Sequence, residues 1–133
     1  MRVVVDTNVF VSAVFFGGVP GRILEAWRDG SVSLVVSPTI LDEYRRVGRE
    51  LATDHKDIDL GPLLGLLAAE ALMVEPPDLA APVCTDPADK FLACALAGRA
   101  RLVVSGDKAL RAVSGWRGID VLSPRVFVDR YLR

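Results

Sequence analysis

The chain has 133 residues, of which 51% are hydrophobic and 25% charged, and its formal net charge is −1. This length allows one domain over residues 1–133 with a real core, and this composition excludes a disordered chain. No apolar run reaches the length of a membrane span and no signal peptide precedes the first strand, so we expect a cytoplasmic protein without membrane contact. The net charge offers no global basic field for nucleic acid. However, thirteen of the sixteen basic residues are arginines, the better planar partner for phosphate.

Cysteine and histidine are too sparse to suggest their usual chemistry. Cys84 and Cys94 lack the spacing of a zinc site or a redox pair, and they are interpreted as two reduced thiols. The single histidine, His55, stands in a polar stretch. An imidazole-based triad or a histidine-rich metal site therefore has little support.

Strands and helices are predicted to alternate along the chain. The first strand is Val3-Val4-Val5, buried on both faces, and further strands are predicted at residues 32–36, 72–74, 102–104 and 119–122. Helices are predicted at residues 7–14, 22–28, 38–51, 60–71 (one helix or a pair), 88–98, 108–113 and 125–132, with a proline-rich connector at 75–82. This alternation predicts an α/β fold in which helices cover both faces of a parallel sheet.

Four acidic residues fall where this architecture can bring them together. Asp6 ends the first strand, and Asp107 follows the fourth strand across Ser105-Gly106. Glu43 lies nearly two turns into the helix after the second strand, and Asp89 lies in the first turn of the helix that follows the connector. Open α/β sheets bind their ligands at the carboxyl ends of strands. These acids are therefore candidates for one site.

Helical geometry separates Glu43 from its neighbour Asp42. At about 100° per residue, Ile40, Tyr44 and the following apolar residues form one narrow stripe. Glu43 lies about 60° from the centre of that stripe and Asp42 about 160° away. Glu43 can therefore flank the buried face and reach a cleft, whereas Asp42 is expected to face solvent.

Each acid also has a structural alternative. An aspartate after a strand commonly caps a helix, and Asp86, before Pro87, is interpreted as such a cap. Asp89 is either a helix-dipole partner or a ligand, and Lys90 and Lys108 could be surface charges. Ser37 and Ser105 are interpreted as caps, although Ser105 could also bond a ligand carboxylate or a phosphate.

Crowded carboxylates favour one kind of chemistry. They repel each other unless a cation neutralises them, and ligand sets made only of oxygen suit Mg²⁺ or Mn²⁺. Such ions hold a phosphodiester, activate a water and stabilise the leaving oxygen. No side-chain nucleophile is then required.

The chain resembles PIN-domain proteins, in the branch that holds toxin components of toxin–antitoxin pairs and is related to VapC toxins. The segments that carry the resemblance are Val5-Asp6-Thr7-Asn8-Val9, Ser37-Pro38-Thr39-Ile40-Leu41-Asp42-Glu43, Asp86-Pro87-Ala88-Asp89-Lys90-Phe91-Leu92-Ala93-Cys94-Ala95, Val104-Ser105-Gly106-Asp107-Lys108-Ala109-Leu110, and Phe16-Gly17-Gly18 through Trp27. They run in order over nearly the whole chain.

The resemblance implies a three-layer α/β/α domain with a five-stranded parallel sheet, and a Mg²⁺- or Mn²⁺-dependent endoribonuclease that hydrolyses RNA phosphodiester bonds. It makes Asp6 the central metal ligand, completed by three further acids: Glu43, Asp89 and Asp107. Asn8 and Ser105 are the supporting residues, and Asp86 is the alternative to Asp89, which ranks first. The implied partners are RNA, a small antitoxin protein and a second copy in a homodimer.

Two other functions remain open from the sequence. One is a catalytically silent PIN domain that serves as an RNA- or protein-binding module. The other is a phosphotransfer protein, since Asp6-Thr7 and Lys108 resemble aspartyl-phosphate sites. Against it, Asn8 stands where haloacid-dehalogenase-type phosphatases need a second aspartate, and Val74 is followed by Glu75-Pro76-Pro77 where a receiver domain would place its phosphoacceptor.

Overall fold

The computed structural model describes residues 1–79, 81–84 and 86–132, with the backbone alone for Asp86 and Pro87. Within these residues no single helix is both long and apolar enough to cross a bilayer. The helices 7–16 and 18–28 together reach that length and hydropathy, but the pair is bent by 94°.

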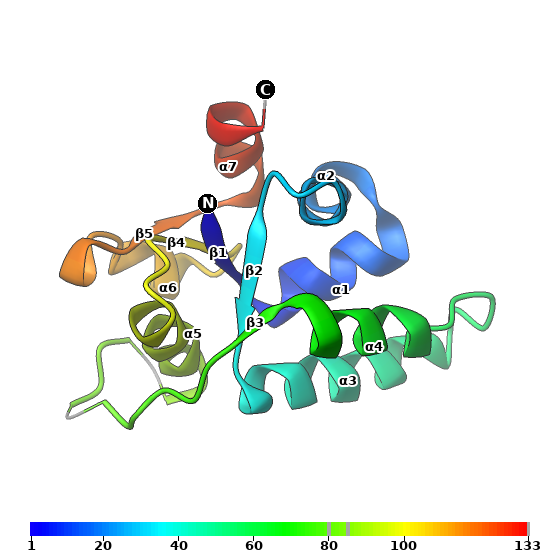
Figure 1. The fold of residues 1–133 in the computed structure, drawn as a ribbon, viewed down its shortest axis with the longest axis horizontal. Helices are drawn as coiled ribbons and strands as arrows, with labels where there is room; N and C mark the ends of the chain where they lie inside the picture. The colour runs from blue at the N-terminus through cyan, green and yellow to red at the C-terminus, as the bar shows by residue number, and fades with distance from the viewer. Residues whose placement is uncertain (80, 85, 133) are drawn as a thin grey trace.

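Five parallel strands form the sheet at the centre of the molecule (Figure 1), in the order β3-β2-β1-β4-β5. Their bounds are β1 Arg2–Val5, β2 Ser33–Val36, β3 Leu72–Met73, β4 Leu102–Val104 and β5 Asp120–Leu122. The strands are short, with two to four residues each. The predicted α/β/α fold with a five-stranded parallel sheet is confirmed.

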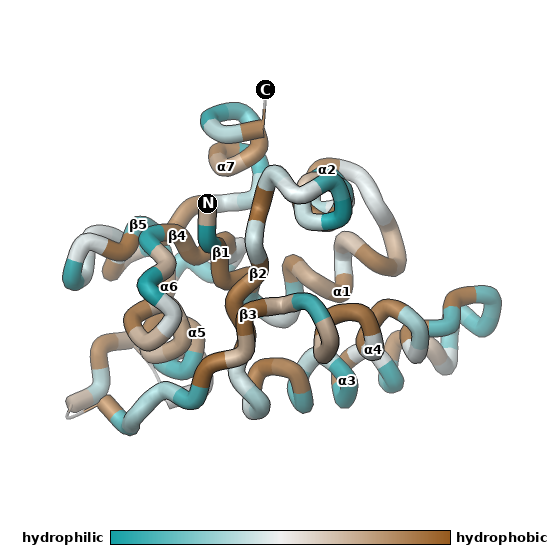
Figure 2. The backbone as a smooth tube through the Cα atoms, viewed as in Figure 1, coloured by the Kyte–Doolittle hydropathy of each residue, from teal (hydrophilic) through white to brown (hydrophobic). Residues whose placement is uncertain are grey.

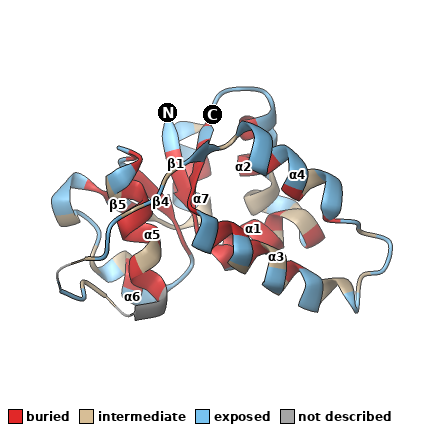
Figure 3. Cartoon of the chain, turned by 60° about the horizontal axis from the view of Figure 1, so that its bottom comes forward, coloured by how far each residue is buried: buried red, intermediate tan, exposed pale blue. Residues whose placement is uncertain are grey.

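The valines of β1 hold the middle of the sheet. Val3 pairs with Leu34 on one side and with Leu102 on the other. All three valines of β1 are at most 2% exposed. Figure 3 shows this buried centre in red, and the tube in Figure 2 is apolar along the same strands. A strand buried on both faces needs an unbroken apolar run, which the sequence supplies.

Seven α-helices and one 3₁₀ turn are present in the described part of the chain. They are α1 Thr7–Phe16, α2 Gly18–Arg28, α3 Pro38–Ala52, α4 Gly61–Glu70, α5 Asp86–Ala97, α6 Lys108–Ala112, η1 Trp116–Gly118 and α7 Pro124–Tyr131. On one face α5 packs across β1, β2 and β4, and α6 packs on β5. On the other face α1 packs against α2 and α3, and α2 packs against α7 (Figure 1).

The two N-terminal helices differ from the prediction at their junction. α1 continues two residues further than predicted and ends at Gly17, whose left-handed φ of 68° turns the chain while its N–H donates to the Ala13 carbonyl. α2 begins at Gly18, four residues before the predicted start. Pro20 does not break it, because the N–H groups of a first helical turn have no partner within the helix. The segment expected as one helix or a pair is the single helix α4.

The order of the strands reverses between β1 and β4, which are neighbours in the sheet. In open α/β sheets such a reversal leaves a crevice outside the carboxyl ends of the two strands. Asp6 directly follows β1 and Ser105 directly follows β4, so both lie at this crevice.

Candidate acidic site at the carboxyl ends of β1 and β4

Asp6 is buried and both of its carboxylate oxygens are hydrogen-bonded. Its backbone continues the sheet, since the Asp6 N–H donates to the Val104 carbonyl at 3.0 Å. Oδ1 accepts from the Val9 N–H at 2.9 Å and so caps α1, while Oδ2 accepts from the Ser105 hydroxyl. The capping role that the sequence left open therefore applies, and it fixes the direction of the carboxylate.

Ser105 joins Asp6 to Asp107. It is fully buried, and its Oγ, besides donating to Asp6, accepts from the Asp107 N–H at 3.0 Å. Asp107 in turn caps α6, with Oδ1 accepting from the Ala109 N–H at 2.9 Å, and it is exposed. One hydroxyl thus fixes the spacing of two candidate acids.

Glu43 reaches the same place from α3. Its carboxylate accepts from the Thr7 hydroxyl through Oε1, and Oε2 lies 2.5 Å from Lys90 Nζ of α5. The Glu43 and Lys90 side chains are 21% and 20% exposed. Asp42, by contrast, is exposed and pairs with Arg45 at 2.8 Å. The two acids therefore lie on the faces of α3 that the helical geometry predicts.

Three candidate acids line one cavity of about 240 Å³. Its lining includes Asp6, Glu43 and Asp107, together with Thr7, Asn8, Arg46 and Lys90. Asn8 is exposed, and its side chain makes no hydrogen bond within the described residues. Asp6, Asn8 and Asp107 also line a second hollow of about 540 Å³. Two of the acids, Asp6 and Asp107, are therefore shared by two hollows, whereas Glu43 lines the first alone.

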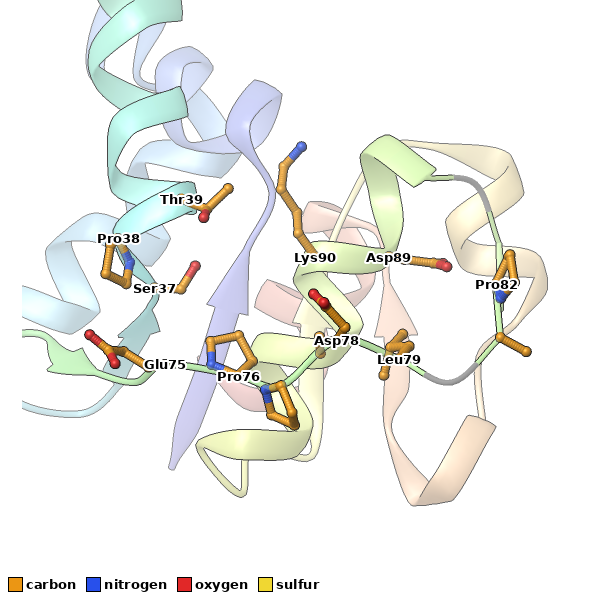
Figure 4. A pocket seen from close by; sticks show the side chains of 13 residues that line it. Ser37, Pro38, Thr39, Glu75, Pro76, Asp78, Leu79, Pro82, Asp89 and Lys90 are labelled. Atoms are coloured by element: carbon orange, nitrogen blue, oxygen red, sulfur yellow. The ribbon is translucent and has the colours of Figure 1, made fainter.

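Asp89 is not brought to this cavity. Its Oδ2 accepts from the Val83 N–H at 2.9 Å and its Oδ1 from the Cys84 N–H at 2.7 Å, so it anchors the segment before α5. Figure 4 shows Asp89 and Lys90 leaving α5 in different directions. The side chain of Asp86, the alternative to Asp89, lies outside the described residues.

The cavity that Asp89 does line, shown in Figure 4, is larger, about 570 Å³. Lys90 lines both this cavity and the acidic cavity. The walls of the larger cavity are the start of α3, with its cap Ser37, and the proline-rich residues 75–79, 81 and 82. Of the four candidate acids, this cavity is lined by Asp89 and not by Asp6, Glu43 or Asp107.

The electrostatics of Asp6 and Glu43 differ. Burial raises the pKa of Asp6 above its ordinary value; the hydrogen bonds from Ser105 and Val9 oppose this rise, and the negative charges of Asp107 and Glu43 add to it. Burial would also raise the pKa of Glu43, but the hydrogen bonds from Lys90 and Thr7 bring it below the ordinary value. Lys90 thus neutralises the charge of Glu43. The charge of Asp6, by contrast, is opposed by burial and by the two other acids, and no cation among the described residues lowers its pKa.

The residues at the crevice fit a hard divalent cation in chemistry. Asp6, Glu43 and Asp107 offer only oxygen donors, and the mutual repulsion at Asp6 is what a bound cation would relieve. In their present rotamers, however, no three acidic, histidine or cysteine side chains of the described residues are gathered as a coordinating group. Glu43 is turned to Lys90, and Asp89 to the segment 83–84.

Three residues that build the site were missed from the sequence. Thr7 and Lys90 hold Glu43 from two sides, although Lys90 was open to interpretation as a surface charge. Tyr44 is buried, stacks on Phe10 with ring centroids 4.1 Å apart, and donates its hydroxyl to the Val5 carbonyl. The position of Thr7 directly after Asp6 was an available signal. Nothing in the sequence pointed to the role of Tyr44.

The comparisons with known proteins agree with this architecture. The model of the PIN-domain family matches residues 2–109. An uncharacterized protein of Methanocaldococcus jannaschii is 32% identical over 118 residues, which are 83% of this chain and 73% of that protein. PIN domains are generally nucleases and typically use divalent metal ions. From the family match over most of its length, this chain belongs to the PIN-domain family.

Proposed function

We propose that this protein is a Mg²⁺- or Mn²⁺-dependent endoribonuclease that hydrolyses RNA phosphodiester bonds at the crevice between β1 and β4. The observation that carries the proposal is the joint lining of one cavity by Asp6, Glu43 and Asp107 at the reversal of strand order. Members of the family are generally nucleases, which supports the reaction class.

In this proposal the acids divide the work. Asp6, Asp107 and Glu43 would hold the cation, with Asn8 as a support. A further ligand would be Asp89, once it released the N–H groups of Val83 and Cys84, or Asp86. The bound cation would supply charge neutralisation for the phosphodiester and for the leaving oxygen. Ser105 holds Asp6 and the Asp107 backbone in register. Thr7 and Lys90 orient Glu43, and Lys90 also brings a positive charge to the cavity wall.

The experiment that tests the proposal is cleavage of a long single-stranded RNA, with Mg²⁺, Mn²⁺ or a chelator present. Asp6→Asn preserves the cap of α1, because asparagine is an equally good cap, and removes the central negative charge. We expect cleavage that needs the metal and is lost in Asp6→Asn. Glu43→Gln should also lose activity, whereas its matched control Asp42→Asn, one residue away on the solvent face, should keep it. Cleavage that persists in chelator and in Asp6→Asn would refute the proposal.

The biological role that we propose is the toxin of a toxin–antitoxin pair in the cytoplasm, working as a homodimer with a small antitoxin protein as its inhibitor. Its support is the resemblance of the motifs to that branch of the family. Induced expression in a bacterial host should arrest growth, and Asp6→Asn should abolish the arrest. Light scattering of the purified protein should give twice the mass of the chain.

A second candidate is a catalytically silent PIN domain that binds RNA or protein. Two observations favour it: Lys90 already neutralises Glu43, and Asp89 is bonded to the backbone at Val83 and Cys84. In that case Mn²⁺ titrated into the metal-free protein in a calorimeter would give the same heat with the unchanged protein as with Asp6→Asn.

A further inference from the structure

Four arginines gather at the amino ends of three neighbouring strands, away from the acids. Arg2 begins β1, Arg101 directly precedes β4, and Arg117 lies in η1, three residues before β5 begins. Arg99 lies in the turn between α5 and β4. Because β1, β4 and β5 are adjacent in the sheet, residues far apart in the sequence meet at this edge.

Two adjoining hollows connect these arginines. One, of about 460 Å³, is lined by Arg99, Arg101 and Arg117. The other, of about 550 Å³, is lined by Arg2, Arg99 and Arg101. The two share Arg99, Arg101 and Gly118, so the hollows adjoin at these residues. We call these four residues the arginine cluster.

The positive charge of the arginine cluster is poorly compensated. All four residues are exposed, and no ion pair within the described residues involves any of them. Arg2 donates to the Gly98 carbonyl at 3.0 Å and Arg117 lies 5.1 Å from the Trp116 ring centre, and neither contact removes charge. Among the residues that the structure describes, Asp120 is the one carboxylate residue that lines either hollow.

The backbone gives an independent observation. Arg99 and Arg117, with φ of 55° and 50°, are the two residues other than glycine that have a positive φ in the described part of the chain. A left-handed residue is ordinarily glycine, because a side chain there costs energy. A left-handed residue is common where a helix ends, so the turn after α5 explains the backbone conformation of Arg99. It does not explain why this residue is an arginine rather than a glycine. Strained residues that persist in a fold cluster at binding sites, and here both line the same hollow.

We propose that the arginine cluster binds backbone phosphates of the RNA strand, at a second site distinct from the acidic crevice. The choice of RNA as the ligand rests on the proposed function. Guanidinium groups match phosphate oxygens in a planar, two-pronged geometry and stay charged at every physiological pH. The crevice presents carboxylates, which repel phosphates, so the other end of the sheet supplies the attraction that the net charge of −1 conceals.

The placement predicts a dependence on RNA length. The cluster and the acids lie at opposite ends of the same strands, β1 and β4. A strand of three or four residues spans about 10–13 Å, so one RNA must pass around the sheet to contact both ends. An oligonucleotide of two or three residues bound at the acids would gain nothing from the cluster, whereas a longer RNA would.

The test uses the full chain and a fluorescently labelled single-stranded RNA of 20 nucleotides in chelator, where no cleavage is expected. The key variant is Arg99→Gly/Arg117→Gly, because glycine suits both backbone positions and the fold should be kept. Arg49→Ala/Lys56→Ala, which changes exposed residues of α3 and the loop after it, is the matched control that removes the same charge. Thermal unfolding of both variants checks that each is folded.

We expect the glycine variant to bind RNA at least tenfold more weakly at low salt, with the control within twofold of the unchanged protein. The dependence of log affinity on log salt should flatten by about 0.7 for each phosphate that the variant no longer neutralises. Equal weakening in the two variants, or no salt-dependent binding by the unchanged protein, would overturn the inference. Stronger binding of polyglutamate than of RNA would also overturn the inference, in favour of an acidic protein partner. Full displacement of the RNA by micromolar nucleoside triphosphate would overturn it in favour of a nucleotide.

This outcome is independent of the cleavage test. If the unchanged protein binds RNA through the arginine cluster but does not cleave it with metal, the proposed function fails and the inference stands. If it cleaves RNA while the glycine variant binds as tightly as the unchanged protein, only the inference fails.

Discussion

The two ends of β1 and β4 are built in different ways. At the carboxyl ends the acids are held by specific hydrogen bonds: Asp6 caps α1, Asp107 caps α6, and Ser105 connects them. At the amino ends the arginines are exposed and carry few bonds, and two of them keep an unfavourable backbone conformation.

The difference teaches how each end can contribute. A carboxylate fixed at both oxygens offers a geometry, which a reaction at one phosphodiester requires. A group of exposed guanidinium ions offers attraction without a fixed geometry, which suits a flexible polyanion of any sequence. Substitutions at the carboxyl ends should therefore change the reaction or the fold, whereas those at the amino ends should change affinity.

After the loss of cleavage expected for Asp6→Asn, the largest effect is expected from Asp107→Asn. The substitution keeps the cap of α6 and removes one charge of the acidic crevice. Its activity on RNA with Mg²⁺ should fall by about 100-fold, equivalent to about 2.7 kcal/mol of barrier. The matched control is Asp120→Asn, at the amino end of β5, which removes a carboxylate beside the arginines and should not slow cleavage. A comparable loss in both variants would remove the distinction between the two ends.

Asp89→Ala should act mainly on stability. Its carboxylate accepts from two backbone N–H groups, of Val83 and Cys84, and alanine leaves both without that acceptor. We expect the free energy of unfolding, measured in urea, to fall by about 2 kcal/mol. Asp89→Asn keeps one acceptor oxygen, so its free energy of unfolding should fall by less. A metal-dependent loss of activity in Asp89→Asn without loss of stability would instead make Asp89 a ligand.

Ser105→Ala should lower the free energy of unfolding by about 1–2 kcal/mol, since Asp6 Oδ2 and the Asp107 N–H lose a buried partner. The hydrogen bond from Ser105 lowers the pKa of Asp6, so its loss should raise that pKa further. Because the proposed reaction needs ionised Asp6, the acid limb of the pH–activity profile should move to higher pH. An unmoved limb would show that Asp6 ionisation does not control the rate.

Asp6→Asn should stabilise the metal-free protein at neutral pH. Since burial raises the pKa of Asp6, folding favours the protonated carboxyl. The stability that this protonated form gives the folded state is lost as the pH rises through the raised pKa. The gain in the free energy of unfolding at pH 7 should lie within roughly 0.5–2 kcal/mol, as for other replacements in a destabilised functional site. It should vanish below the unfolded-state pKa, where Asp6 is protonated as well. Mg²⁺ should then raise the unfolding temperature of the unchanged protein but not of Asp6→Asn. A variant less stable at pH 7 would contradict this account.

The smallest effect concerns the amino ends. Arg99→Gly should raise the free energy of unfolding by up to about 1 kcal/mol, because glycine adopts the left-handed backbone without a steric cost. The extra entropy of glycine in the unfolded chain reduces this gain. Arg101→Gly, at a residue without positive φ, should instead lose about 0.5–1 kcal/mol. If the free energies of unfolding in denaturant change in opposite directions for the two variants, the strain at Arg99 is supported. If both change in the same direction, it is not.

Much of the fold follows from local patterns in the sequence. The valines of β1 can be buried only between two layers, and the serine–proline pairs at Ser37 and Ser123 begin α3 and α7 as caps. The helical stripe of α3 separates Glu43 from Asp42 without any knowledge of the tertiary structure. Each of these depends on neighbours a few residues away.

The meeting of the strand ends did not follow from local patterns. Whether Asp6 and Asp107 share a crevice depends on β1 lying next to β4, a long-range pairing. The contact of Asp89 with the segment 83–84 depends on the path of an irregular loop. The arginine cluster gathers positions 2, 99, 101 and 117, and its charge disappears in a net charge of −1.

One peptide group, between Val5 and Asp6, is tied at both of its polar atoms. Its N–H donates to the Val104 carbonyl, and its carbonyl accepts from the buried Tyr44 hydroxyl. This plane cannot rotate without breaking a hydrogen bond to β4 or one to α3, so the Asp6 carboxylate starts from an immobile base. The entropy of ordering that side chain is lost during folding, and a ligand that arrives at Asp6 does not lose it again.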